Sequence, residues 1–416
     1  MRGRNGIETE ATATATAAPT PAAPLGRNRN YLLLLTGQFV SQMGDRLAMV
    51  AFPWLVFTRT DSYVGTGAIF ALYTLPYVLF GVFAGVVIDR VNKRRLMVST
   101  DVIRAGLIAL VPVAAAWSLP AVYVLSFLTA TASVFFEPTK LAILPEIVPR
   151  EKLLRANSLL ATGDNLTEVL GYGLAGAIVA VFGTRAFHID AATFLISAFA
   201  LLLMRYRAPS RAMRRVARSL DHDIREGMSY LRRHRGLLAN TLMVLAAAVG
   251  LGAAWSLTFF LAFQVFDGGP EVFGIFEATI GAGYLVGSIG VAMAATRFPK
   301  GVAMSVGLAI MGAAMVTVAV APTVWLATVP FLIVGVANAV VLIAIDTYVQ
   351  EVVPQDVLGR VLGARFALTQ GTFAVSVLVG GALAGVFEVR ALFIVAGILV
   401  AVPGIIALFV REIRNA

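Results

Sequence analysis

Long apolar segments follow one another along this chain and constrain its fold more than any other feature of the sequence. A helix needs about 20 apolar residues to cross the roughly 30 Å hydrocarbon core of a bilayer. Of the 416 residues, 59% are hydrophobic and only 13% are charged, unlike a soluble globular protein. We therefore predict an all-α integral membrane protein with twelve transmembrane helices, over residues 31–57, 64–88, 97–116, 120–143, 157–182, 186–205, 237–263, 271–296, 301–321, 323–346, 361–386 and 391–410.

Basic residues are distributed unequally between the loops that these helices leave. With a cytoplasmic N-terminus, most of the 33 Lys and Arg fall in cytoplasmic loops, and the outside loops hold only Arg59, Arg185 and Arg390. Short cytoplasmic loops of membrane proteins are rich in Lys and Arg. We expect a multi-pass protein in the lipid bilayer of the inner (cytoplasmic) membrane, with both termini in the cytoplasm. The same pattern explains the net charge of +10 without a nucleic-acid partner.

The apolar segments divide into two groups of six around a polar linker. We predict a disordered cytoplasmic tail at 1–30, which includes the low-complexity run ATATATAAPTPAAP, and a short cytoplasmic tail at 412–416. Between the tails we predict a six-helix bundle at 31–205, a cytoplasmic linker at 206–236 and a second six-helix bundle at 237–411.

The linker contains a predicted amphipathic helix. Apolar residues recur at helical spacing in SLDHDIREGMSYLRRH, with arginines on the rest of the surface; they are Leu220, Ile224, Met228 and Leu231. Such a helix can lie along the inner leaflet of the membrane. It can equally pack on the cytoplasmic ends of the bundle, and the sequence leaves both alternatives open.

The two halves of the chain resemble each other. The segment PEIVPREKLLRA, from Pro145, matches QEVVPQDVLGRV, from Gln350, so that Glu146 corresponds to Glu351. The match continues at the same offset into the following apolar segment, which indicates duplication. Two repeats of six helices in the same orientation form an architecture in which two pseudo-symmetric bundles rock about a central site.

A charged loop joins the second and third predicted helices. Its sequence, GVVIDRVNKRR, offers a glycine for close helix approach, an acid that can cap a helix or pair with a base, and a run of bases. We predict a latch that holds the cytoplasmic side shut, made of Gly85, Asp89, Arg90, Lys93, Arg94 and Arg95. A basic loop that only fixes orientation is the alternative.

The same loop resembles the signature of the major facilitator superfamily, which has a glycine, an Asp-Arg pair, a second glycine and basic residues. Asn92 stands in place of the second glycine, and because asparagine tolerates a positive φ, we expect the turn to survive. The closer resemblance is to the branch with macrolide-efflux proteins and the enterobactin exporter, through GDRLAMVAFPWLVF, FFEPTKLAILPEIVPREKLLRANSL and DIREGMSYLRRH. It implies the major facilitator fold and transport by alternating access, but no particular substrate.

Ionisable residues inside a membrane normally face a wet cavity or a partner. Asp45 lies about 21 Å along a helix from Tyr31, near the bilayer midplane. We predict that it binds a proton or a cation; a purely structural salt bridge is the alternative. Asp164 and Glu168 form a second acidic site, for which hydrogen bonding between the bundles is the alternative. The predicted proton-coupling or substrate cavity consists of Asp45, Arg46, Asp164, Glu168, Gln42 and Asn338.

Other charged residues are expected nearer to the ends of the helices. Asp101 and Arg104, and likewise Glu137 and Lys140, lie one turn apart and can neutralise each other. We predict that these four residues pair with one another or gate the cytoplasmic side. A solvated or gating position just below the outer surface is predicted for Asp190 and Glu277.

These features favour a secondary active transporter. The sequence has no phosphate loop of the type G-x-x-x-x-G-K-[ST] and no cysteine, so we expect no ATP site, no cofactor and no metal site, with the proton gradient as the energy source. We predict a monomer that is not an enzyme and that exports a hydrophobic or amphipathic small molecule, such as a drug, antibiotic or siderophore, in exchange for protons. The family's proton-antiporter signature has a proline where Tyr172 stands. The alternatives are a gradient-driven importer or facilitator of a nutrient and a membrane sensor that does not transport.

Overall fold

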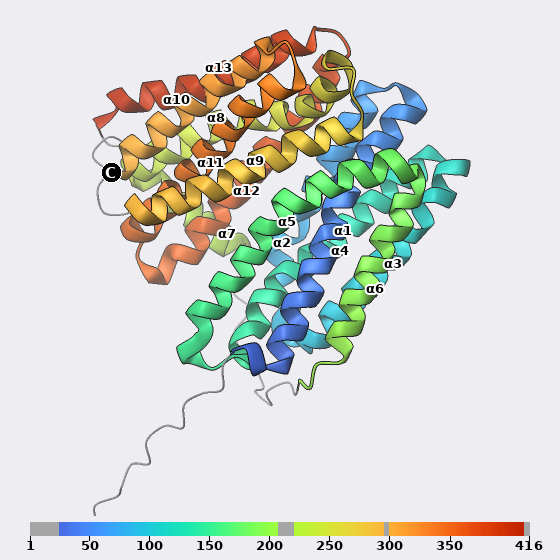
Figure 1. Cartoon of the computed structure of the whole chain (residues 1–416). Helices are drawn as coiled ribbons and strands as arrows, with labels where there is room; N and C mark the ends of the chain where they lie inside the picture. The colour runs from blue at the N-terminus through green and yellow to red at the C-terminus, as the bar shows by residue number, and fades with distance from the viewer. Residues whose placement is uncertain (1–24, 207–219, 295–298, 412–416) are drawn as a thin grey trace, which may run out of the picture.

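The computed structural model describes residues 25–206, 220–294 and 299–411, and these ranges contain helices and no strand (Figure 1). The first half has six long helices, α1 (Arg29–Thr60), α2 (Tyr63–Arg90), α3 (Lys93–Trp117), α4 (Leu119–Ile147), α5 (Leu153–Phe182) and α6 (Ala186–Leu202). The second half has six more, α8 (Arg235–Phe260), α9 (Pro270–Ala294), α10 (Lys300–Val320), α11 (Val324–Val352), α12 (Gln355–Ala384) and α13 (Val389–Phe409). A shorter helix, α7 (Leu220–Arg233), lies between the halves in the sequence. The predicted all-α membrane fold is confirmed.

Ten segments of the described chain are long and apolar enough to cross a membrane. One of them, Arg150–Leu202, contains both α5 and α6, which are joined by the 3-10 turn Gly183–Arg185. Helix α1 is not among the ten, because polar residues such as Gln38, Gln42 and Asp45 interrupt its apolar sequence. The first helix therefore combines a membrane-spanning length of 32 residues with polar side chains.

The long helices form two bundles (Figure 1). In the first bundle α1 packs on α5 and α6, and α3 packs on α4 and α6. In the second, α10 packs on α11 and α13, and α8 packs on α12 and α13. Across the bundles, α2 packs on α12 and α5 packs on α9. α2 and α9 are the second helices of their halves, and α5 and α12 are the fifth. Both contacts between the bundles therefore join a second helix to a fifth helix, so the internal repeat makes them equivalent.

Two ion pairs show the internal repeat in side-chain detail. Lys93 at the start of α3 donates to Glu146 at the end of α4 over 2.6 Å. Lys300 at the start of α10 donates to Glu351 at the end of α11 over 2.7 Å. Both ion pairs join the third helix of a half to the fourth, and we call them the repeat clamps. The duplication predicted from the sequence is thus visible as matching contacts.

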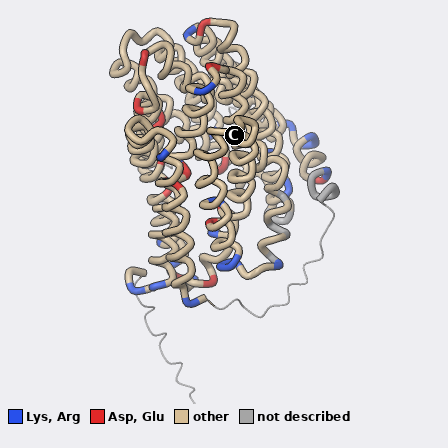
Figure 2. Tube along the Cα trace, turned by 90° about the vertical axis from the view of Figure 1, so that its right-hand side faces the viewer, with Lys and Arg blue, Asp and Glu red and all other residues tan. Residues whose placement is uncertain are grey.

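The two bundles touch at one end of the molecule. A Cβ atom on Gly67 of α2 would lie 3.0 Å from the Cα atom of Gly381 of α12, so the two backbones are in contact. Beside them, the ring centroid of Phe57 lies 5.7 Å from those of both Phe259 and Phe260. We call this the sealed end. The opposite end, where α1 begins, is the basic end, and Figure 2 shows several Lys and Arg residues there, at the bottom of the view.

Towards the basic end the same helix faces diverge. Gly81 follows Gly67 by about four helical turns on α2, and Gly363 precedes Gly381 by about five turns on α12, so each pair shares a face. A Cβ atom on Gly81 or on Gly363 would meet no atom within 4 Å. The bundles are therefore in contact at the sealed end and separate towards the basic end.

The linker helix α7 packs on the second bundle, against α12 and α8. Glu226 of α7 forms an ion pair with Arg360 of α12, and Leu231 is 1% exposed. Of the two alternatives for this helix, packing on the bundle is the one that the structure has. The side chains of Leu220 and Ile224 lie outside the described part of the structure.

The described chain is ordered from an earlier residue than predicted. Leu25 is buried, and the side chain of Asn28 accepts a hydrogen bond from the backbone N–H of Tyr31 over 3.1 Å. The same side chain donates to the carbonyl of Ile147 over 2.7 Å. The predicted disorder is wrong for residues 25–30, because these hydrogen bonds fix the start of α1 to the end of α4. Parts of the predicted tails and linker lie outside the described residues, namely 1–24, 207–219 and 412–416.

Candidate functional site

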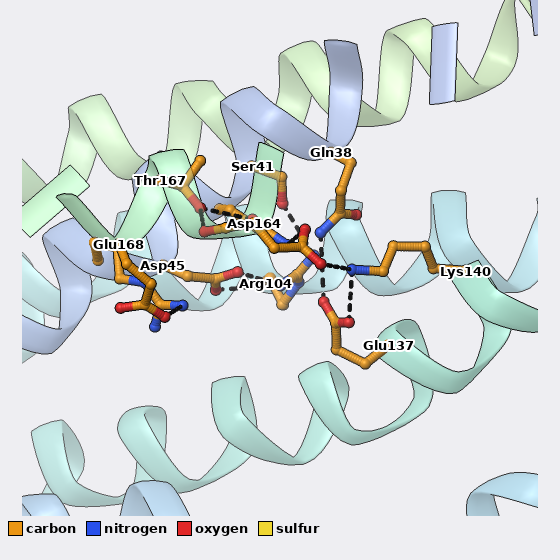
Figure 3. A network of polar contacts seen from close by, with 11 residues as sticks. Gln38, Ser41, Asp45, Arg104, Glu137, Lys140, Asp164, Thr167 and Glu168 are labelled. Atoms are coloured by element: carbon orange, nitrogen blue, oxygen red, sulfur yellow. Dashed lines mark hydrogen bonds and ion pairs between the residues drawn. The ribbon is translucent and has the colours of Figure 1, made fainter. Parts of the chain in front are cut away.

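One face of α1 carries the polar residues that organise the candidate site. Gln38, Ser41, Gln42 and Asp45 recur at spacings of three and four residues, which places them on one side of the helix. Their partners come from α3, α4 and α5 (Figure 3). A single helix of the first bundle thus meets three others through polar contacts at the middle of the membrane-spanning region.

Arg104 on α3 is the centre of the first ion cluster (Figure 3). It donates to Asp45 over 3.3 Å and forms an ion pair with Asp101, one turn away on α3. Ser41 and Ser133 accept further hydrogen bonds over 3.3 Å. Two phenylalanine rings cover the guanidinium carbon at 4.6 and 4.2 Å. Because Arg104 is only 2% exposed, its charge depends on the two carboxylates.

Lys140 on α4 is the centre of the second ion cluster. Its ammonium lies 2.8 Å from a carboxylate oxygen of Glu137 and 3.5 Å from one of Asp164 on α5. Gln38 donates to Glu137 over 3.3 Å, and Gln42 donates to Asp164 over 2.6 Å. The lysine side chain is buried, whereas those of Glu137 and Asp164 are 44% and 43% exposed. These two carboxylates are therefore open to solutes.

Arg46 has a separate partner, which the sequence did not identify. It forms an ion pair with Glu168 of α5, and its guanidinium carbon lies 5.3 Å from the ring centroid of Tyr172, one turn further along α5. Successive residues of a helix point about 100° apart, so Asp45 faces α3 while Arg46 faces α5. The adjacent acid and base of α1 thus belong to different ion pairs.

Carboxylates outnumber cations in this group of residues. Arg104 and Lys140 each serve two carboxylates, whereas Arg46 serves one. With all groups ionised, one negative charge remains uncompensated in each of the two clusters. Excess charge inside a membrane protein is costly unless a proton or a counter-ion balances it. The arrangement is therefore suited to bind a proton or a cationic group.

A cavity of about 580 Å³ lies between the two bundles. The first bundle supplies what we call the ionic wall, which consists of Asp45, Arg46, Arg104, Glu137 and Asp164. The second bundle supplies the aromatic wall, which consists of Trp255, Phe366 and Phe373. The ring centroids of Trp255 and Phe373 are 5.5 Å apart, so these rings form a continuous surface. The cavity can therefore hold a molecule with a charged and an aromatic or apolar side.

The structure brings together most of the predicted cavity residues. Those that line the cavity are Gln42, Asp45, Arg46 and Asp164. Glu168 does not line the cavity and instead pairs with Arg46. Asn338 is not among the residues that line this cavity; it is half-buried on α11, which packs on α9 and α10.

The sequence reasoning missed the contribution of α2 to the cavity. Tyr73, Thr74 and Tyr77 line it from this helix. Thr74 and Tyr77 are polar positions three residues apart in an otherwise apolar span, and that spacing is the signal that identifies their common face. Tyr73 lies four residues before Tyr77, so the same helical spacing adds it to this face.

The predicted latch residues contact their own bundle. Lys93 pairs with Glu146 of α4 in one repeat clamp. Arg94 donates to the carbonyl of Leu201 over 2.8 Å and also to that of Leu202, at the end of α6. A cation at a helix C-terminus satisfies free carbonyls and complements the helix dipole. These contacts tie α3 to α4 and α6.

The remaining residues of the motif have different surroundings. Arg90 and Arg95 are exposed, whereas the surroundings of Gly85 and the side chain of Asp89 lie outside the described part of the structure. Asn92 is the N-cap of α3: its side chain accepts a hydrogen bond from the N–H of Arg95 over 3.1 Å, and its φ is −68°. The turn therefore forms without the positive φ that asparagine tolerates, because at this position asparagine serves as a capping acceptor.

One repeat clamp has a third member beyond the membrane spans. Tyr206, after α6, donates its hydroxyl hydrogen to Glu146. Burial and the adjacent carboxylate raise the pKa of Tyr206 above its ordinary value, so the phenol remains a donor at neutral pH. The chain that leaves α6 is thereby fixed to α4.

Two acids for which a solvated or gating position was predicted are buried. Asp190 on α6 is 0% exposed and Glu277 on α9 is 8% exposed. A Cβ atom on Gly44 of α1 would lie 2.4 Å from a carboxylate oxygen of Asp190 and 2.1 Å from the hydroxyl of Thr193. The solvated alternative is wrong, because α6 packs closely on α1 and α9 packs closely on α5. The gating alternative stays a prediction.

The sequence matches known membrane transporters along nearly its whole length. The profile of a family described as transmembrane secretion effector (MFS_3) matches residues 19–415. The MFS-type transporter YfiS of Bacillus subtilis (strain 168) is 29% identical over 94% of this chain and 96% of its own length. The multidrug efflux pump Tap of Mycolicibacterium fortuitum is 26% identical, and macrolide efflux protein A of Streptococcus pyogenes is 22% identical, each over 92% of this chain and 96% of its own length.

Among solved structures, a crystal structure of the nucleoside transporter NupG matches with a TM-score of 0.72. The match covers 91% of this chain and 98% of that one, at 12% sequence identity. At this identity the likeness shows the fold alone. The resemblance to macrolide-efflux proteins noted from the sequence is confirmed by the matches to the curated relatives.

Proposed function

Because the chain belongs to the transmembrane secretion effector family of major facilitator transporters, we propose that it is a proton-coupled exporter of hydrophobic or amphipathic molecules that carry a cationic group. The observation that carries this proposal is the cavity with an ionic wall on one side and an aromatic wall on the other. Excess carboxylates suit a cation or a proton, and aromatic rings suit both an apolar body and a positive charge. The relatives named as efflux proteins support export.

We place the basic end in the cytoplasm and the sealed end outside the cell, in the inner membrane. The concentration of Lys and Arg in the loops of the basic end supports this orientation. In this orientation the two bundles are separate on the cytoplasmic side. A drug in the cytoplasm or in the inner leaflet therefore has access to the cavity. One chain encloses the whole cavity and is the proposed transport unit.

The proposed cycle begins when the substrate cation binds Glu137 and Asp164, the exposed carboxylates of the ionic wall. Rocking of the two bundles then opens the sealed end and closes the basic end. Outside protons neutralise the carboxylates and displace the cation, and the bundles return with the protons bound. Asp45 is the proposed coupling acid, because it faces the cavity and shares Arg104 with a buried second acid. A proton and a substrate cation thus exclude each other, which couples their opposite fluxes.

Asp45→Asn tests the proposed role of Asp45 in coupling. Everted membrane vesicles from cells without their own efflux pumps should take up ethidium, a fluorescent aromatic cation, when a proton gradient is imposed. A protonophore should abolish this uptake. Because asparagine cannot carry a proton, Asp45→Asn should reduce gradient-driven uptake to the level of vesicles that lack the protein, while ethidium still binds to the purified variant.

Glu271→Gln is the matched control, since Glu271 is an exposed acid at the sealed end and should retain normal uptake. Size-exclusion profiles of both variants should equal that of the unaltered protein. Full gradient-driven uptake by Asp45→Asn removes this residue from the coupling role. Ethidium flux that persists in either direction without a proton gradient supports the gradient-driven facilitator instead.

A further inference from the structure

Glu277 lies between the two bundles. Gly274, Glu277 and Gly281 share one face of α9, because Glu277 follows Gly274 by one helical turn and Gly281 follows Gly274 by two. A Cβ atom on Gly274 would lie 2.5 Å from the carbonyl oxygen of Tyr172, and one on Gly281 would lie 3.1 Å from the Cβ of Glu168. Since both of those residues belong to α5, this face of α9 packs on α5. We call this contact the α5–α9 seam, and it places Glu277 against the first bundle.

The carboxyl group of Glu277 is closed off in the structure. The residue is 8% exposed and does not line the cavity. Its Oε1 atom has no hydrogen-bond partner in the described part of the chain. A carboxylate with an unpartnered oxygen is costly inside a membrane protein, and a neutral carboxyl is much less so. The closed seam therefore suits Glu277 as a neutral acid.

The charged surroundings of Glu277 favour the same form. From the first bundle, Arg46, Glu168 and Tyr172 interact with it electrostatically. Arg46 is already paired with Glu168, so an ionised Glu277 adds a second carboxylate to one cation and repels the first. The π-helical turn Leu261–Val265 has no titratable side chain. On α9 itself the titratable groups are Glu271 and Tyr284, and those of α8 and α11 lie towards the basic end, namely Arg235, Asp346, Tyr348 and Glu351.

We propose that Glu277 is a proton-binding residue that controls closure of the sealed end. The α5–α9 seam closes when its carboxyl is protonated and separates more readily when it is ionised. This inference rests on the proposed function for its direction: outside water reaches the seam only when the sealed end opens. A proton taken up from outside then favours the return of the bundles to the state described here. The second bundle thereby takes part in coupling, although its cavity wall is aromatic.

Spin labels across the sealed end measure this closure directly. The chain has no cysteine, so labels attach only at introduced positions. Val64→Cys on α2 and Val386→Cys after α12 are suitable, because both side chains are exposed and belong to opposite bundles. Without substrate or gradient, the labelled protein should show a short distance at mildly acidic pH and an added longer distance at mildly alkaline pH. In Glu277→Gln, which is always neutral, the longer-distance population should be lost at both pH values.

Glu271→Gln again serves as the control, and it should keep the pH response of the unaltered chain. Should Glu277→Gln fail to fold, Glu277→Met, which is similar in size and also neutral, is expected to give the same closed seam. The proposal is overturned if the neutral variant gains the longer distance between the labels at alkaline pH, as the unaltered protein is expected to do. It is also overturned if the neutral variant shows the longer distance at both pH values, or if the distances in the unaltered protein do not change with pH. Because no substrate is present, these distances do not depend on whether ethidium is exported, so the two proposals fail separately.

Discussion

Asp45, Arg46 and the glycine before them form a short segment in which each residue meets a different helix. Asp45 faces Arg104 on α3, and Arg46 faces Glu168 on α5. Gly44 faces α6, where a Cβ atom would collide with side-chain atoms. Removing one partner of a buried ion pair costs about 3–5 kcal/mol, because the other charge is left uncompensated. A rotation of α1 about its axis would therefore disturb both ion pairs and the close contact with α6 at the same time.

Gly44→Ala tests the contact with α6. The new methyl group would lie 2.1 Å from the hydroxyl of Thr193, so α1 and α6 must move apart. We expect a loss of about 1–3 kcal/mol in stability, measured as a lower melting temperature in detergent. Gly106→Ala on α3 is the control, because a Cβ atom there meets nothing within 4 Å. A Gly44→Ala protein as stable as this control would contradict the contact, whereas partial recovery in a double variant with Thr193→Ala would support it.

Helices and their local pairs were predictable from the sequence, but the partners across helices were not. Apolar length located each span, and a spacing of one turn identified the pairs Asp101–Arg104 and Glu137–Lys140. The sharing of each cation with a carboxylate of another helix depends on how the helices are rotated about their axes. That rotation is set by packing between segments far apart in the sequence, which a single chain does not reveal. Glycines carry part of this information, since they mark where two backbones touch.

Gly67→Val tests the contact of α2 with α12. Because a Cβ atom at this position already lies 3.0 Å from the Cα atom of Gly381, a valine should hold the sealed end apart. We expect the equilibrium between the short and the longer distance of the spin-label pair at positions 64 and 386 to shift towards the longer distance. The expected change in free energy is about 1–3 kcal/mol. Gly81→Val, on the same face of α2 but with nothing within 4 Å, should leave the distances unchanged. Equal behaviour of the two variants would show that the contact of α2 with α12 does not hold the bundles together.

The two bundles have the same arrangement of helices but different chemistry on the walls of the cavity. The repeat clamps are preserved in both halves. The charged side chains that line the cavity come from the first bundle, whereas the aromatic rings that line it come from both bundles. The sequence predicted the two repeats and the acids of the first bundle. The surroundings of Asn338 and Glu277 were not predictable, because the depth and rotation of α9 and α11 follow from contacts with α5 and α10.

Trp255→Ala tests the separate role of the aromatic wall. Loss of this ring should raise the ethidium concentration for half-maximal uptake by about tenfold, as expected for a lost aromatic and cation–π contact. Sensitivity to a protonophore should remain, because the ionic wall is intact. Trp325→Ala is the control, since this tryptophan is 72% exposed on α11 and does not line the cavity. An unchanged half-maximal concentration in Trp255→Ala would exclude the aromatic wall from substrate binding.

The repeat clamps also bear on how a protein of this kind can change its cargo over evolutionary time. Duplication left the same Lys–Glu joint in each half, while the residues that face the cavity diverged. Arg104 and Lys140 take their ionic partners from the first bundle, so substitutions at Trp255 or Phe373 leave those partners in place. If the proposed function holds, a change of cargo therefore requires substitutions in only one of the two inherited copies, while the ion pairs of the other copy stay intact.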